Sequence, residues 1–145
     1  NAQVAEGRQR DQPRDGVRYD YVCTMKGVME KYKPGDYEFD LPKNVVELAQ
    51  KKDYGQYIDK QRNDLVVSFI TTNDITGGNS GSPVINANGE LVGLAFDGNY
   101  EALSHKIAFD KDLNRTICVD VRYVLWCIDK LGNAPHLIKE LKLIK

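Results

Sequence analysis

The chain has 145 residues, about the length of one domain, and its composition, 41% hydrophobic and 28% charged, is that of an ordinary globular protein. Twenty Lys and Arg against 21 Asp and Glu give a formal net charge of -1, which excludes the basic surface typical of nucleic-acid binders. The longest apolar run, residues 65–70, is far shorter than the ~18 residues of a membrane-spanning helix. We therefore expect no nucleic-acid partner and no membrane span.

The first half of the chain carries few strong structural signals. Residues 1–16 are polar and contain the turn cluster Gln-Pro-Arg-Asp-Gly, so we expect them to be loosely ordered. Aromatic and β-branched residues alternate loosely over 17–28 and predict a strand before a polar loop. Apolar residues on one side predict a short helix over 42–52, which Gly55 ends.

The second half begins with β structure and closes with helices. Apolar runs predict strands over 65–71, 83–86, 91–96 and 116–119, with Asn88-Gly89 as the hairpin turn between the second and the third. Two terminal helices are predicted over 120–145, the first capped by Asp120 and the second opened by Pro135. The apolar stripe of the last helix consists of Leu137, Ile138, Leu141 and Ile144. The chain should be mainly β.

Three cysteines, Cys23, Cys118 and Cys127, are an odd number and show no C-x-x-C spacing. They argue neither for a disulfide framework nor for a zinc site. We interpret them as small buried hydrophobic residues.

The most informative segment is 76–83, Thr-Gly-Gly-Asn-Ser-Gly-Ser-Pro, between two predicted strands. A catalytic serine needs a glycine-rich turn, because its hydroxyl must project while backbone N–H groups converge on the oxygen that becomes negative. Ser80 is the candidate nucleophile, and the N–H groups of Ser80 and Gly78 are the candidate oxyanion hole. The alternative interpretation of this segment is a polar hairpin loop without a catalytic role.

Residues 78–83 resemble the nucleophile loop of chymotrypsin-fold serine proteases, whose usual form is Gly-Asp-Ser-Gly-Gly-Pro. Asn79 replaces the acid that pairs with a newly cut amino terminus in trypsin-like zymogens, which argues against that activation route. Ser82 replaces a glycine and fits a narrower family, the bacterial dipeptidyl-peptidase 7 and 11 group of serine exopeptidases. The matching strings extend over roughly 13–141 and lie at 13–16, 27–31, 72–83, 93–99 and 119–125.

This resemblance implies a two-barrel catalytic domain that is interrupted by a helical domain. Residues 1–145 would be a single unit, the C-terminal part of that catalytic domain. It would comprise the second chymotrypsin-like antiparallel β-barrel, which carries the nucleophile, and short helices, two of them C-terminal.

The resemblance also implies two substrate-binding residues. Asp97 matches the carboxylate that binds the free α-amino group of the substrate, a charge-assisted contact suited to an exopeptidase. Gly98 matches the position that lines the pocket for the penultimate substrate residue, where acid-preferring relatives carry Arg. Without a side chain there, we expect an open, uncharged pocket for large apolar residues. Without the resemblance, residues 96–99 are simply a turn after a strand.

Ser80 has no convincing base within this sequence. His105 lies in a polar loop and His136 near the start of the last helix, and both follow Ser80, whereas chymotrypsin-like proteases order their triad His, Asp, Ser. We expect the base and its Asp upstream, outside these residues. The 145 residues alone should then show little or no peptidase activity.

The function that the resemblance implies is a serine dipeptidyl peptidase. It would release dipeptides from free N-termini of oligopeptides with a hydrophobic penultimate residue, without metal or cofactor. Its partners would be peptide substrates, the first barrel and helical domain of the same enzyme, and a second copy in a homodimer, at a periplasmic or cell-surface location. Two alternatives remain open: a periplasmic chymotrypsin-fold endoprotease, and a non-catalytic binding module that keeps the fold.

Overall fold

The structure, a computed structural model, describes residues 21–99, 102 and 112–144. These residues form two compact parts. One part contains residues 21–22 and Ser68–Val121, and the other contains Cys23–Val67 and residues 122–144. The expected loose order of residues 1–16 lies outside the described residues, and the single unit over 1–145 stays a prediction.

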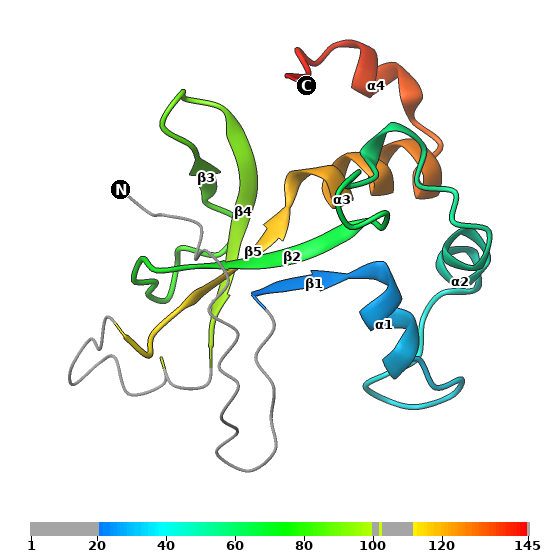
Figure 1. The fold of residues 1–145 in the computed structure, drawn as a ribbon, viewed down its shortest axis with the longest axis horizontal. Helices are drawn as coiled ribbons and strands as arrows, with labels where there is room; N and C mark the ends of the chain where they lie inside the picture. Colours follow the sequence, from blue (N-terminus) through cyan, green and yellow to red (C-terminus); the bar gives the residue numbers. More distant parts are fainter. Residues whose placement is uncertain (1–20, 100–101, 103–111, 145) are drawn as a thin grey trace. The chain divides into compact units, whose positions relative to one another are not determined.

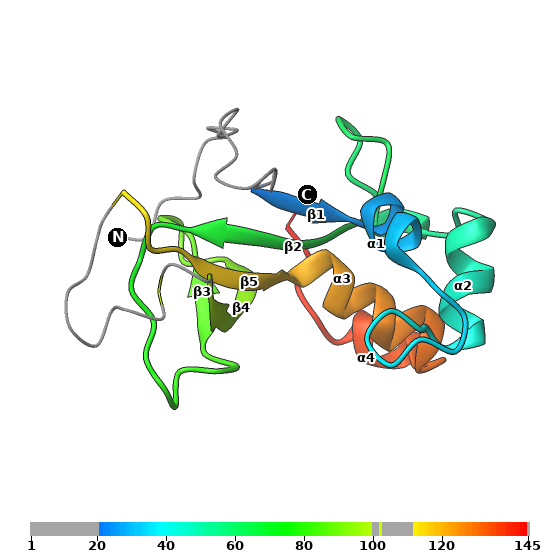
Figure 2. The same cartoon turned by 90° about the horizontal axis from the view of Figure 1, so that it is seen from below.

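A five-stranded sheet has the order β1-β2-β5-β4-β3 (Figure 1). Its strands are β1 (Val22–Thr24), β2 (Val66–Thr71), β3 (Pro83–Ile85), β4 (Leu91–Gly98) and β5 (Thr116–Asp120). β5 lies between β2 and β4 and is antiparallel to both, and β3 is antiparallel to β4 (Figure 2). The prediction of an antiparallel sheet with short helices is confirmed.

The sheet of the described residues is open, whereas the resemblance implied a closed barrel. Its outer strands, β1 and β3, have only three residues each. Closing a sheet requires enough strands, each long enough to tilt and stagger against its neighbours. Five strands with such short outer members do not meet that condition, so both outer edges remain.

The backbones of β4 and β5 lie very close to each other at Gly93. Every second residue of β5 is buried, beginning with Thr116 and Cys118. On β4, Gly93 pairs with Asp120, and a Cβ at Gly93 would lie 2.5 Å from the Val119 carbonyl oxygen and 2.8 Å from the ring of Phe69. Only glycine fits there without displacing backbone.

The predicted hairpin between β3 and β4 is confirmed. The Gly89 N–H donates to the Asn86 carbonyl at 3.0 Å, and Gly89 has a φ of +80°. The Asn86 N–H donates to the Glu90 carbonyl at 3.0 Å, which closes the loop. Glycine adopts this left-handed conformation at little cost, so the turn forms where the sequence indicated.

The second part is helical. It contains α1 (Met25–Lys31), α2 (Lys43–Gln50), the 3-10 turn η1 (Gly55–Tyr57), α3 (Val121–Trp126), the π-helical turn η3 (Cys127–Leu131) and α4 (Pro135–Lys139). Trp126 is fully buried, and its indole N–H donates to the Asp53 carbonyl at 2.9 Å. The helix predicted over 42–52 is confirmed as α2, with Val46 and Ala49 on its buried side.

The strand predicted over 17–28 is wrong in its second half. β1 ends at Thr24, and α1 begins at Met25. The Met25 N–H donates to the Leu65 carbonyl at 2.8 Å, and the Lys26 N–H donates to the Asp64 carboxylate at 3.0 Å. The first N–H groups of a helix have no partner within it, so these two distant acceptors stabilise a helix start here.

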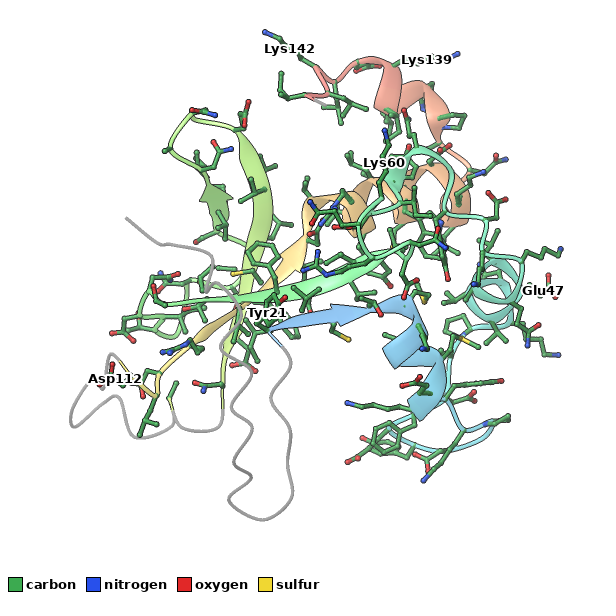
Figure 3. The ribbon with its side chains drawn as sticks, viewed as in Figure 1. Tyr21, Glu47, Lys60, Asp112, Lys139 and Lys142 are labelled. Carbon is green, nitrogen blue, oxygen red and sulfur yellow. The ribbon has the colours of Figure 1, made fainter. Side chains whose placement is uncertain are left out.

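The two terminal helices are present, but the second is shorter than predicted. α4 ends at Lys139, and of the predicted stripe only Ile138 is buried, whereas Leu137, Leu141 and Ile144 are exposed. Lys139 and Lys142 project from this last segment (Figure 3). The apolar spacing therefore predicted the helix but not its length.

None of the three cysteines forms a disulfide bond with another. Cys118 is buried, as predicted, whereas Cys23 and Cys127 are half-buried. Burial raises the pKa of the Cys118 thiol, although its contact with the Thr71 hydroxyl lowers it in part. No helix within residues 21–99 and 112–144 is long and apolar enough to cross a membrane.

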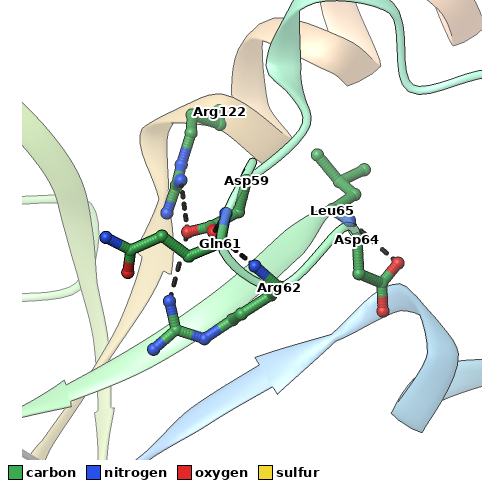
Figure 4. A network of polar contacts seen from close by, with 6 residues as sticks. All are labelled: Asp59, Gln61, Arg62, Asp64, Leu65 and Arg122. Carbon is green, nitrogen blue, oxygen red and sulfur yellow. Dashed lines mark hydrogen bonds and ion pairs between the residues drawn. The ribbon is translucent and has the colours of Figure 1, made fainter.

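Asp59 forms ion pairs with two arginines of the helical part (Figure 4). Its carboxylate accepts hydrogen bonds from the Arg122 guanidinium at 2.9 Å, the Arg62 guanidinium at 3.2 Å and the Arg62 N–H at 2.9 Å. Burial by itself would raise the pKa of Asp59, but the Arg62 N–H and the two cations outweigh burial and hold that pKa below its usual range. Asp59 is thus ionised in the folded chain at neutral pH and links the segment that follows η1 to α3.

We expect the stability contributed by Asp59 to depend on pH. Because its pKa is lower in the folded state, the contribution is present above the unfolded-state pKa, about 4, and is lost as pH falls through the folded-state value. Asp59→Asn should lower the free energy of unfolding by about 1 kcal/mol at pH 7, since solvent screens the partly exposed arginines. Urea unfolding at several pH values should show this difference shrink as the pH falls below the unfolded-state pKa. The exposed Glu47→Gln is the control, and a difference that grows in acid would contradict the assignment.

Candidate active site

Two consecutive turns form the segment that precedes and includes Ser80. The Asn79 N–H donates to the Thr76 carbonyl at 3.1 Å, and the Ser82 N–H donates to the Asn79 carbonyl at 2.9 Å. The Asn79 side-chain oxygen accepts from both the N–H and the hydroxyl of Thr76, each at 3.0 Å. Asn79 therefore organises the first turn, a role that the sequence analysis did not assign to it.

Ser80 lies on the surface at the second turn. Its neighbours Gly78 and Gly81 have φ values of +95° and +86°, and no atom lies within 4 Å of a Cβ built at either. The Ser80 hydroxyl donates to the Phe96 carbonyl at 3.3 Å. A hydroxyl at an exposed turn between left-handed glycines has the open approach that a nucleophile needs.

The candidate oxyanion hole consists of the Gly78 and Ser80 N–H groups. Within the described residues, neither N–H donates a hydrogen bond to a protein acceptor. Asn79 and Ser82, by contrast, use their N–H groups to close the turns. This pattern agrees with the predicted role of Gly78 and Ser80, which stays a prediction.

A β-bulge at Phe96 exposes the strand segment beside Ser80. Ala95 pairs with Cys118 and Asp97 pairs with Ile117, so β4 has one extra residue at this point. Ala95 is buried, whereas Phe96 and Asp97 are both exposed. Bulges redirect side chains and are frequent next to active sites. Sequence reasoning missed Phe96, since a bulge depends on the partner strand rather than on local pattern.

Asp97 and Gly98 follow the bulge. The Asp97 carboxylate is exposed, and one of its oxygens accepts the Gly98 N–H at 2.8 Å. A Cβ built at Gly98 would lie 3.0 Å from the Ala102 Cβ and 3.6 Å from a methyl group of Ile75. Ala102 and Ile75 are buried apolar residues, so the atoms nearest to a side chain at Gly98 among the described residues are apolar.

Within the compact part that contains Ser80, the described residues include no histidine. His136 is exposed on α4, in the other part of the chain, and His105 lies outside the described residues. No group of three or more His, Cys, Asp or Glu side chains that might hold a metal ion occurs among the described residues. The structure thus brings together Ser80, Gly78, Asp97 and Gly98 within one compact part and leaves the proton acceptor unassigned.

The family model for Peptidase S46 matches residues 6–143, nearly the whole chain. The chain belongs to the Peptidase S46 family. Among curated relatives, Dipeptidyl-peptidase 7 of Capnocytophaga gingivalis is 56% identical over 94% of this chain, and that of Porphyromonas gingivalis is 54% identical over 92%. An Asp/Glu-specific dipeptidyl-peptidase of Capnocytophaga gingivalis is 52% identical over 92%.

Solved structures show the same fold. DPP11 of Porphyromonas endodontalis in complex with the dipeptide Arg-Asp superposes with a TM-score of 0.84, at 41% identity over 90% of this chain. The complex of that protein with substrate gives 0.82, at 42% identity over 89%. The chain spans only about a fifth of these S46 relatives, 19% of the first Dipeptidyl-peptidase 7 and 19% of both solved chains.

Gly78 provides a test of the candidate oxyanion hole. Gly78→Ala adds a Cβ to a left-handed residue, which costs about 1–3 kcal/mol or rotates the peptide that carries the N–H. Gly77→Ala is the matched control, because Gly77 has open space around it and no positive φ. In the full-length protein, fluorophosphonate labelling of Ser80 should slow about 10-fold or more in Gly78→Ala, as expected for one lost oxyanion donor. Equal rates for the two variants would contradict the assignment.

Proposed function

We propose that this chain supplies the nucleophile and the amine-binding carboxylate of a serine dipeptidyl peptidase. Membership of the S46 family and the names of the relatives support a peptidase that removes dipeptides. In this proposal the enzyme cleaves oligopeptides with a free N-terminus and prefers a hydrophobic penultimate residue. A homodimer and a periplasmic or cell-surface location remain expectations from the family resemblance.

The observation that carries the proposal is the contact between the Ser80 hydroxyl and the Phe96 carbonyl at 3.3 Å. Phe96 directly precedes Asp97, so the candidate nucleophile touches the strand that presents the candidate amine-binding carboxylate. A dipeptidyl peptidase must hold the substrate ammonium two residues before the bond that it cleaves. A serine and a carboxylate on adjoining segments of one compact part can set that distance.

In the proposed reaction, the Ser80 oxygen attacks the carbonyl carbon of the second peptide bond. The hydroxyl proton passes to a histidine that we expect in the remainder of the enzyme, and the carbonyl oxygen becomes negative near the Gly78 and Ser80 N–H groups. The C–N bond then breaks, and the departing amine takes the proton from the histidine. Water hydrolyses the dipeptidyl ester, which releases the dipeptide and restores the Ser80 hydroxyl.

Asp97 explains why such an enzyme would require a free N-terminus and cleave at a fixed distance from it. Its carboxylate is exposed and, among the described residues, accepts the neighbouring Gly98 N–H, so it can accept the ammonium group of a substrate. A blocked N-terminus offers neither the positive charge nor the donors of an ammonium group. The Asp97 carboxylate then loses its ion pair, and the blocked peptide binds less well.

Gly98, Ala102 and Ile75 support the hydrophobic preference. Gly98 contributes no side chain, and the atoms nearest to its missing Cβ are the apolar groups of Ala102 and Ile75. Apolar groups at this position favour a hydrophobic penultimate residue, because they give a carboxylate nothing in return for its lost hydration. The named relatives include both Dipeptidyl-peptidase 7 and Asp/Glu-specific enzymes, so the family alone does not determine this preference.

Dipeptide release from matched peptides tests the function. In the full-length enzyme, a peptide with a free N-terminus and a hydrophobic second residue should be cleaved, and its acetylated counterpart should not. Ser80→Ala should reduce kcat by about 1,000-fold or more, as loss of a nucleophile does. Asp97→Asn should mainly raise KM, because a carboxamide cannot form the ion pair with the substrate ammonium.

Each alternative predicts a different result in this assay. Equal cleavage of the acetylated and the free peptide, with Ser80 still required, would indicate an endoprotease. Failure of a fluorophosphonate to label Ser80 in the folded full-length protein would indicate a non-catalytic module. Activity that survives in Ser80→Ala would refute the assignment of the nucleophile.

Gly98 allows a test of substrate preference. Gly98→Arg introduces a cation beside the penultimate side chain, and Ala102 must yield by only a few tenths of an ångström to admit its Cβ. We expect kcat/KM for an Asp or Glu penultimate residue to rise relative to a hydrophobic one by about 10-fold or more, the value of one charge-assisted contact. Gly98→Gln, uncharged and of similar length, is the control and should lower hydrophobic cleavage without that gain. An unchanged ratio in Gly98→Arg would remove Gly98 from the pocket.

A further inference from the structure

Asn73 is the centre of a polar network where the chain leaves β2. Its side-chain NH₂ group donates to the Thr116 hydroxyl at 3.0 Å and to the Asp74 carbonyl at 2.9 Å. Its side-chain oxygen accepts from the Thr71 hydroxyl, and its backbone carbonyl accepts from the Thr116 hydroxyl at 2.8 Å. The Asn73 side chain thus uses both donors and its acceptor within the protein.

Burial makes this network costly to break. Thr71 and Thr116 are almost completely buried, and the Thr71 hydroxyl also contacts the Cys118 sulfur at 3.7 Å. A buried polar group that loses its partner keeps the cost of desolvation without the hydrogen bond. The Thr116 hydroxyl accepts a hydrogen bond from the Asn73 side chain and donates one to the Asn73 carbonyl. These two bonds fix Asn73 against β5.

The network joins the two segments that form the candidate site. Thr116 lies opposite Gly98 in the ladder between β5 and β4. Asn73 begins the loop that ends at Ser80, and Ile75, two residues further on, lies against Gly98. Thr116 therefore lies opposite the strand of Asp97 and Gly98 in the ladder, and its side chain is hydrogen-bonded to the loop of Ser80.

We propose that Thr116 and Asn73 are positioning residues that set the register of the Ser80 loop against the substrate-binding strand. The proposal rests on the proposed peptidase function. It deepens that function by giving a role to two residues whose side chains do not touch the candidate nucleophile or the substrate-binding residues. The hydrogen bonds between Thr116 and Asn73 form a clamp, and without them the loop beyond Thr71 loses its polar attachment to β5. A displacement of Ser80 then slows acylation while Asp97 and Gly98 remain on β4.

Thr116→Val tests the clamp with almost no change in volume. It removes the hydroxyl but keeps a β-branched side chain suited to a strand. In the full-length enzyme, kcat for dipeptide release and the rate of fluorophosphonate labelling of Ser80 should fall together by about 10- to 100-fold, as a misplacement near 1 Å can cause. KM should stay within about threefold, and Thr116→Ser, which restores the hydroxyl, should recover most of both rates.

Two further variants separate positioning from loss of folding. Asn73→Ala removes the other side of the clamp at a half-buried loop residue and should repeat the split between kcat and KM. Ile138→Ala, in the core of the helical part and remote from Ser80 in the sequence, should lower the unfolding temperature but leave kcat unchanged. If Thr116→Val does not fold, the Asn73→Ala result decides.

The outcomes distinguish this inference from the proposed function. Unsubstituted enzyme that neither labels at Ser80 nor releases dipeptides refutes the function itself. Active unsubstituted enzyme, with Asn73→Ala and any folded Thr116→Val labelled at the normal rate, refutes only the clamp. A loss of rate that Thr116→Ser does not restore also refutes it, because the hydroxyl would then not be the group responsible.

Discussion

The pairing of β5 with both β2 and β4 is the constraint on which the candidate site depends. β2 leads into the loop of Ser80, and β4 carries Asp97 and Gly98, so the two segments share one partner strand. Backbone hydrogen bonds on both sides fix β5, and its buried residues exclude water from the ladder. Any change in the register of β5 would move Ser80, the candidate nucleophile, relative to the Asp97 carboxylate.

Both short-range and long-range interactions determine the position of Ser80. The turns within 76–82 depend on neighbours, with Asn79 bonded to Thr76 and glycines in left-handed conformations. The attachment of these turns to the sheet depends on distant residues, through the Gly81 N–H to the Ala95 carbonyl at 2.7 Å and the Ala95 N–H to the Ser82 carbonyl at 2.8 Å. The local shape of the loop is thus encoded nearby, and its location is encoded by β4.

The sequence predicted those features that neighbouring residues determine. The strands over 65–71, 83–86, 91–96 and 116–119 and the turn at Asn88-Gly89 were found because apolar runs and glycines determine them locally. The helix α1 was missed, since its first N–H groups depend on Leu65 and Asp64, about forty residues away. A motif and a family resemblance indicated Ser80 and Asp97 as candidates. Nothing in the sequence indicated Phe96 or the contact between Asn73 and Thr116, because both depend on distant segments.

The extra residue at Phe96 also separates β4 into two stretches whose inward and outward sides are set independently. Ala95 and Gly93 are directed inward, and in an unbroken strand Asp97 would share their side and lose its hydration. The bulge interrupts that alternation. The residues before it can therefore face the core while Asp97, after it, stays exposed to solvent. A single bulge thus allows one strand both to pack against the core and to present a charged side chain to solvent.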